Sequence, residues 1–233
     1  EAELVRSLRG QRPAIMILTG SRFADSTVHD SLVEELTAYQ STGGRVVFLG
    51  QGSLPFPSVV LENRAGAFAL AQALVAQGYR RFGVLGGQPS LLTAVDRVAG
   101  FVAGAKDAGV AVNPDHIVYG DFTREGGYTA MDTLITHHLD AIDLVFAAND
   151  VMAVGALSAL REHNVDVPGD IALAGYDDIQ TARDVYPPLT TVHVALDQVG
   201  ELAVGLALEG SAAATLSVDS SVVLRASTPR RGA

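Results

Sequence analysis

The chain contains no cysteine and no tryptophan in its 233 residues, and Lys106 is its only lysine. Without cysteine it can form neither a disulfide framework nor a thiolate zinc site, which suits the reducing cytoplasm, although periplasmic binding proteins often lack cysteine too. A Walker A phosphate loop needs Gly-Lys-Ser/Thr, and Lys106 is followed by Asp107. The sequence therefore excludes that kind of nucleotide site.

Other catalytic motifs are also missing from the sequence. There is no GxGxxG, GxSxG or HExxH pattern. His137 and His138 are neighbours on an expected helix, where they point about 100° apart and do not readily share a metal. The pair Asp177-Asp178 fits either a turn with one capping carboxylate or a ligand-binding position. We therefore expect no enzyme activity, no metal and no cofactor.

The chain also lacks any uninterrupted run of about 18 apolar residues, so no membrane span is expected. Its first residues do not resemble a signal peptide. The net charge of −10 should repel phosphate backbones. If the protein binds DNA, another segment must do so.

Short apolar runs rich in β-branched residues recur between stretches of helical periodicity. This alternation predicts βαβ units and parallel sheets with helices on both faces, which is an α/β fold. The expected strands cover residues 14–18, 45–49, 57–61, 82–86, 116–120, 143–148, 171–175 and 221–226.

Two of the helices can be placed by their end signals. Residues 66–78 form one, with Gly78 in position for a left-handed cap. Residues 151–163 form another, for which Asp150 is the expected N-terminal cap because a carboxylate accepts hydrogen bonds from the first free backbone N–H groups.

From Pro57 onward, an ordered series of segments resembles the LacI/GalR family of bacterial transcription regulators. The segments are LENRAGAFALAQALVAQGYRRFGVLGG, DRVAGFVAGAKDAGV, GDFTREGGYTAM, FAANDVMAVGALSALREHNVDVPGDIALAGYDDI, YPPLTTVHVALDQVGELAVGLAL and VVLRASTPRR. Residues 146–179 are the most specific part of this resemblance.

The resemblance implies a type I periplasmic-binding-protein-like fold, with two Rossmann-like α/β lobes joined by three crossing strands and an effector in the cleft. The crossings are expected near residues 62–63, 191–192 and 219–222. The N-terminal lobe would consist of residues 1–62 and 192–219 and be incomplete. The C-terminal lobe would consist of residues 63–191 and 220–233. A helix-turn-helix DNA-binding domain would precede residue 1.

The same resemblance identifies five effector-binding residues. Arg97 matches an arginine that clamps a hydroxyl pair or a carboxylate, a task suited to its planar fork of donors. Thr93 matches a small hydroxyl position, with a helix cap as the alternative. Asn149 and Asp177 match hydrogen-bonding positions at two strand ends. Phe122 matches an aromatic wall, or else is an ordinary core residue.

Two departures from the family pattern bear on the ligand. Leu91 stands near the position of a second basic residue in the purine-responsive branch, which argues against recognition of a purine by two arginines. Gly50 stands where relatives usually carry an aspartate, which weakens a simple hexose assignment unless Gln51 or Ser53 substitutes.

The sequence thus predicts the cytoplasmic effector-sensing core of a regulator, binding a small sugar-like molecule and acting on operator DNA through the missing domain. A homodimer is expected from the family and from apolar helix faces at 66–78 and 195–208. The alternative is a periplasmic sugar-binding protein of a transporter, which shares the fold.

Overall fold

The structure is a computed structural model that describes residues 1–23, 27–50, 54–210 and 214–232. The chain divides into two compact units. Unit 1 comprises residues 1–62, 90–93 and 195–219, and unit 2 comprises residues 63–89, 94–194 and 220–233. This division differs from the expected lobes in two places, because residues 90–93 group with unit 1 and residues 192–194 with unit 2.

Unit 1 is built on a four-stranded parallel sheet in the order β1-β2-β3-β9. Its elements are α1 (Ala2–Gly10), β1 (Ile15–Thr19), α2 (Thr27–Ser41), β2 (Arg45–Gly50), β3 (Ser58–Leu61), α8 (Leu196–Glu209) and β9 (Thr215–Val218).

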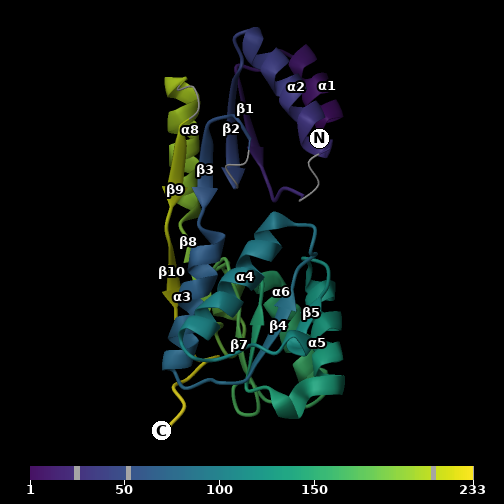
Figure 1. The fold of residues 1–233 in the computed structure, drawn as a ribbon, viewed down its shortest axis with the longest axis vertical. Coiled ribbons are helices and arrows are strands. Elements are labelled where there is room, and N and C mark those ends of the chain that lie inside the picture. Colours follow the sequence, from purple (N-terminus) through teal and green to yellow (C-terminus); the bar gives the residue numbers. More distant parts are fainter. Residues whose placement is uncertain (24–26, 51–53, 211–213, 233) are drawn as a thin grey trace. The chain divides into compact units, whose positions relative to one another are not determined.

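Helices cover both faces of this sheet (Figure 1). Successive side chains of a strand point to opposite faces. On β2, Val46 and Phe48 therefore pack into the cluster formed with α1 and α2, while Val47 packs against α8. The continuous apolar run of β2 is explained by this burial on two faces.

Unit 2 contains a second four-stranded parallel sheet, in the order β5-β4-β6-β7, and an antiparallel pair of β8 and β10. Its helices are α3 (Asn63–Ala76), α4 (Leu92–Asp107), η1 (Pro114–His116), α5 (Arg124–His138), η2 (Leu139–Ala141), α6 (Asp150–Glu162) and α7 (Thr181–Asp184), where α4 begins at the boundary with unit 1. Its strands are β4 (Phe82–Gly86), β5 (Ile117–Tyr119), β6 (Leu144–Ala147), β7 (Ala172–Ala174), β8 (Thr191–Val194) and β10 (Ser220–Val223).

The core of unit 2 also lies on both faces of its sheet. On one face, the ring of Phe146 stacks on Phe101 of α4 with centroids 4.4 Å apart. On the other face, Val145 and Leu173 pack with Met131 of α5 and other buried residues of α5 and α6. The predicted α/β class with parallel sheets is confirmed.

Most predicted strands lie within one or two residues of those observed, and Gly78 has the expected left-handed backbone with φ 103°. The strand β8 begins where a crossing strand was expected near residues 191–192, whereas β9 was not predicted as a strand and residues 224–226 do not continue β10. Within the described residues, no helix is both long and apolar enough to cross a membrane.

Candidate functional site

Polar side chains gather at the carboxyl ends of the parallel strands of unit 2. Asn149 follows β6, Asp177 follows β7 and Phe122 follows β5, while Arg97 lies on α4, the helix after β4. Parallel strands end at a common edge of their sheet, and ligands of open α/β sheets bind at that edge.

Arg97 is buried, with 4% of its surface exposed. Its Nε donates to Oδ1 of Asn63 at 2.9 Å, and its Nη1 donates to the carbonyl of Ala148 at 2.9 Å. Its Nη2 forms an ion pair with Oδ1 of Asp177 at 2.7 Å. These acceptors come from α3 and from the ends of two strands, so the guanidinium is fixed in place.

Aromatic rings also surround this guanidinium. Its Cζ lies 3.9 Å from the ring centroid of Tyr176 and 5.8 Å from that of Phe122. The Phe122 ring packs against Gly87, where a Cβ would come within 2.2 Å of Cδ2 of the ring. Contact with the faces of aromatic rings favours a positive charge. The rings therefore stabilise the guanidinium of Arg97 in its buried position.

Asp177 is the accessible member of the ion pair. Its side chain is 29% exposed, compared with 5% for that of Arg97. Its backbone has φ 110°, and its N–H donates to the carbonyl of Val192 on β8 at 2.9 Å. The site thus offers solvent a hydrogen-bond acceptor with a negative charge, backed by a buried positive charge.

Asn149 is the N-terminal cap of α6, and its side-chain oxygen accepts the Met152 N–H at 2.7 Å. Its amide Nδ2 lies 3.4 Å from the carbonyl oxygen of Phe122. The prediction that Asp150 caps this helix is therefore wrong. The helix begins one residue earlier than expected, which gives the capping position to Asn149.

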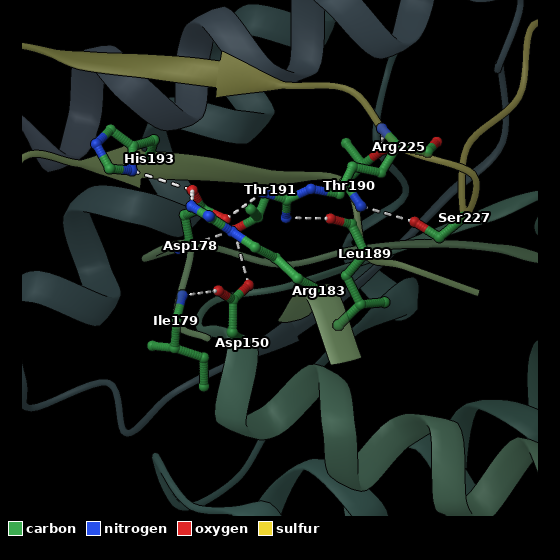
Figure 2. A network of polar contacts seen from close by, with 10 residues as sticks. All are labelled: Asp150, Asp178, Ile179, Arg183, Leu189, Thr190, Thr191, His193, Arg225 and Ser227. Carbon is green, nitrogen blue, oxygen red and sulfur yellow. Dashed lines mark hydrogen bonds and ion pairs between the residues drawn. The ribbon is translucent and has the colours of Figure 1, made fainter. Parts of the chain in front are cut away.

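Asp150 instead lies buried next to Ile179 and Thr191 (Figure 2). Its Oδ1 accepts the hydroxyl of Thr191 at 2.7 Å, and its Oδ2 accepts the Ile179 N–H at 3.0 Å. Burial raises the pKa of Asp150 to about 7. The hydrogen bonds from Thr191 and Ile179 lower this pKa, and the charges of Asp177 and Asp178 raise it.

The structure brings four of the five predicted residues together, namely Arg97, Phe122, Asn149 and Asp177. Thr93 belongs to unit 1, where its backbone N–H donates to Oγ of Ser21 at 3.2 Å.

Leu91 and Gly50, the two departures from the family pattern that bear on the ligand, lie in unit 1. Leu91 forms an isolated bridge with Phe23, and Gly50 has φ 128°. Gln51 and Ser53, which were considered as substitutes for a missing aspartate, lie outside the described residues.

Sequence reasoning missed two residues that hold Arg97, namely Asn63 and Tyr176. Asn63 was expected only at a chain crossing, and no role was predicted for Tyr176. Their positions in the GYDD and ENR segments were the only signal. In the described ranges, no group of three or more His, Asp or Glu side chains is arranged to hold a metal ion.

Comparison with known proteins gives a consistent result. Residues 71–228 match the family model described as periplasmic binding protein-like domain. The HTH-type transcriptional repressor PurR of Klebsiella pneumoniae (strain 342) is 36% identical over 183 residues, which cover 77% of this chain and 53% of the repressor. The chain thus spans about half the length of this curated relative.

Solved structures of regulators share the fold over nearly the whole chain. The transcriptional regulator CelR in complex with cellobiose is 28% identical, with a TM-score of 0.82 over 97% of this chain and 69% of that one. A LacI-family transcriptional regulator from Burkhoderia phymatum is 29% identical, with a TM-score of 0.80 over 98% of this chain and 82% of that one.

Proposed function

We propose, from the premise that this chain belongs to the family of periplasmic binding protein-like domains, that it is the effector-sensing domain of a bacterial regulator of the LacI family. Its relatives by sequence and by structure are named as transcriptional repressors and regulators, which favours sensing over catalysis. DNA binding is assigned in this proposal to a helix-turn-helix domain ahead of residue 1, and the protein acts as a homodimer in the cytoplasm.

The observation that carries the proposal is the Arg97–Asp177 pair at the carboxyl edge of the unit 2 sheet. Arg97 gives hydrogen bonds to three protein acceptors, whereas the Asp177 carboxylate keeps an exposed surface. An exposed carboxylate accepts hydrogen bonds from hydroxyl groups and repels anions.

We therefore propose that the effector is an uncharged molecule rich in hydroxyl groups, such as a sugar. A sugar ring would donate to Asp177 and lie against the flat face of Phe122, with Asn149 as a further hydrogen-bonding group. The cellobiose bound by the related regulator supports this class of ligand. The role of Thr93 remains a prediction, because that residue belongs to unit 1.

Regulation would follow from differential binding. An effector that binds one conformation of the protein better than another shifts the population toward the first, and affinity for DNA changes with it.

A thermal-shift screen of the full-length protein tests the effector class. A ligand of the native state raises the Tm by mass action. We expect cellobiose or another neutral sugar to raise the Tm of the wild type and not that of Asp177→Ala. The matched control is Asp115→Ala, which removes an exposed carboxylate from η1 and should respond as the wild type does. Hits confined to sugar phosphates or carboxylic acids would contradict the proposal.

A periplasmic sugar-binding protein of a transporter is the alternative, because the matched family description fits it equally. Sequencing of the gene ahead of residue 1 separates the two functions. A helix-turn-helix there supports the regulator, and a signal peptide there supports the transporter. Light scattering of the full-length protein tests the homodimer, and a strict monomer would refute it.

A further inference from the structure

Asp178, the neighbour of Asp177, is held by positively charged and imidazole side chains (Figure 2). Its Oδ1 lies 2.5 Å from Nη2 of Arg225, and its Oδ2 lies 2.9 Å from Nη2 of Arg183. Nδ1 of His193 lies 3.0 Å from the same Oδ2. Only 2% of the Asp178 side chain is exposed, so this residue does not itself face the solvent that Asp177 reaches.

The partner at the shortest distance, Arg225, is itself anchored. Its Nη1 donates to the carbonyl of Leu189 at 2.8 Å, and its backbone N–H donates to Oγ1 of Thr190 at 2.8 Å. The N–H of Thr190 in turn donates to Oγ of Ser227 at 2.8 Å. Through Arg225, Asp178 is thus linked to the hydrogen bonds that join the start of β8 to the segment after β10 (Figure 2).

The turn that carries both aspartates has a backbone that needs such support. Asp177 has φ 110° and Asp178 has φ 55°, a region that residues other than glycine rarely adopt. Two further ties hold the turn, because the Asp178 N–H donates to Oγ1 of Thr191 and the Ile179 N–H donates to Asp150. The surroundings, and not the local backbone preference, therefore determine the shape of the turn.

The pKa of Asp178 shows that its carboxylate is charged when it binds these arginines. Burial pushes the pKa of Asp178 upward, but the hydrogen bonds and charges of Arg183 and Arg225 outweigh burial and lower the pKa below its ordinary value. The carboxylate therefore stays charged at neutral pH and keeps its hold on Arg225.

We propose that Asp178 is a positioning residue for the effector site: by binding Arg225 it locks the left-handed turn and so keeps the Asp177 carboxylate on Arg97. The proposal rests on the proposed function for its biological meaning, but its structural content is independent of any effector. Loss of the Asp178 carboxylate should free the turn and release Arg97 from Asp177, without loosening the rest of unit 2.

The chain offers a matched control at the opposite end of the same sheet. Asp143 precedes β6, is 7% exposed and pairs with Arg231 at 3.0 Å and with Arg81 at 3.8 Å. It is also a buried carboxylate between arginines, but it does not contact the turn. Asp143→Asn therefore removes comparable chemistry from unit 2 without touching the effector site.

The test is hydrogen exchange measured by NMR on the whole chain without ligand. The Arg97 Nη2–H, which donates to Asp177 and is assigned by its absence in Arg97→Lys, reports the ion pair. The Ile179 amide reports the turn, and the Leu134 amide reports the core of unit 2. In Asp178→Asn we expect at least tenfold faster exchange of the first two protons, with Leu134 unchanged. In Asp143→Asn all three should exchange as in the wild type, or all three should change together.

A rate for Arg97 in Asp178→Asn that stays within twofold of the wild type, relative to Leu134, would overturn the proposal. If Asp178→Asn does not fold, Arg225→Gln removes the same ion pair from the other side, and the same outcomes apply. Failure of the effector screen would refute the proposed function alone, because this measurement uses no effector.

Discussion

Arginine–aspartate ion pairs lie at both ends of the unit 2 sheet, but a different partner is buried at each end. At the amino end, the buried Asp143 carboxylate accepts the Arg81 N–H at 3.0 Å and pairs with Arg231. At the carboxyl end, Arg97 is the buried member of the pair, and Asp177 keeps 29% of its side chain exposed. An ion pair whose carboxylate is buried ties loops together, whereas one whose carboxylate is exposed leaves an acceptor for a ligand.

The backbones at the two ends differ as well. Asp177 and Asp178 at the carboxyl end are two adjacent residues with positive φ values, whereas among the described non-glycine residues of unit 2 the amino end has only Asn164, with φ 57°. Strained backbone in folded proteins clusters at functional sites, where surrounding contacts maintain it. The amino end therefore has the character of a structural junction, and the carboxyl end that of a binding site.

The largest effect is expected for Arg97→Ala. This change removes the donor from the Ala148 carbonyl and from Asn63, and it leaves Asp177 without its cation. Asp177 is partly exposed and can be hydrated, so the main cost comes from the two buried acceptors that lose a donor, at roughly 1–3 kcal/mol of unfolding free energy each. Urea denaturation measures this loss. The amino-end control Arg231→Ala, whose side chain is 47% exposed, should cost about 1 kcal/mol or less. If Arg97→Ala and Arg231→Ala lowered the unfolding free energy equally, the proposed difference between the two ends of the sheet would be wrong.

A smaller effect, which depends on pH, is expected for Asp150→Asn. Because burial raises the pKa of Asp150 to about 7, the folded state binds a proton more tightly than the unfolded chain between that pH and the ordinary pKa of 3.8. Stability from this group is present at low pH and declines as pH rises through 7, by about 2 kcal/mol between pH 5 and pH 8. The asparagine variant should lack this decline in thermal denaturation curves. A wild-type curve that is flat over this range would contradict the assignment.

The smallest effect on stability is expected for Asn149→Ala, which tests whether Asn149 binds the effector or only caps α6. Asn149→Ala and Thr123→Ala each remove the N-terminal cap of one helix in unit 2, α6 and α5 respectively. Each should lower the unfolding free energy by about 1 kcal/mol. Only Asn149→Ala should also reduce the thermal shift given by a sugar that binds the wild type. If both variants bind that sugar equally well, Asn149 is a cap and nothing more.

The fold was readable from the sequence because buried parallel strands appear as continuous apolar runs. The runs at 45–49 and 82–86 match β2 and β4 closely. In contrast, β9 is a four-residue segment, TLSV, with exposed and partly exposed positions, and its partner β3 is far away in sequence. Periodicity gives little signal for such a segment, because the pairing comes from tertiary structure.

The site was readable only in part. Arg97 and Asp177 stood out by residue type and by family pattern, but neither pattern shows that Tyr176 lies under the guanidinium. Asn and Asp cap helices about equally well, so residue type gave no reason to prefer Asn149 over the predicted cap Asp150. The choice depends on a contact that is distant in sequence, the one between Asp150 and Thr191.

The ion pair between Asp178 and Arg225 has a consequence for folding during synthesis of the chain. Arg225 lies 47 positions after its partner Asp178. A growing chain that has emerged from the ribosome through Asp177 already contains every predicted effector residue, yet it lacks the arginine that closes the turn. Under our proposal the protein becomes competent to sense its effector only late in synthesis, when the segment after β10 has been added and has docked.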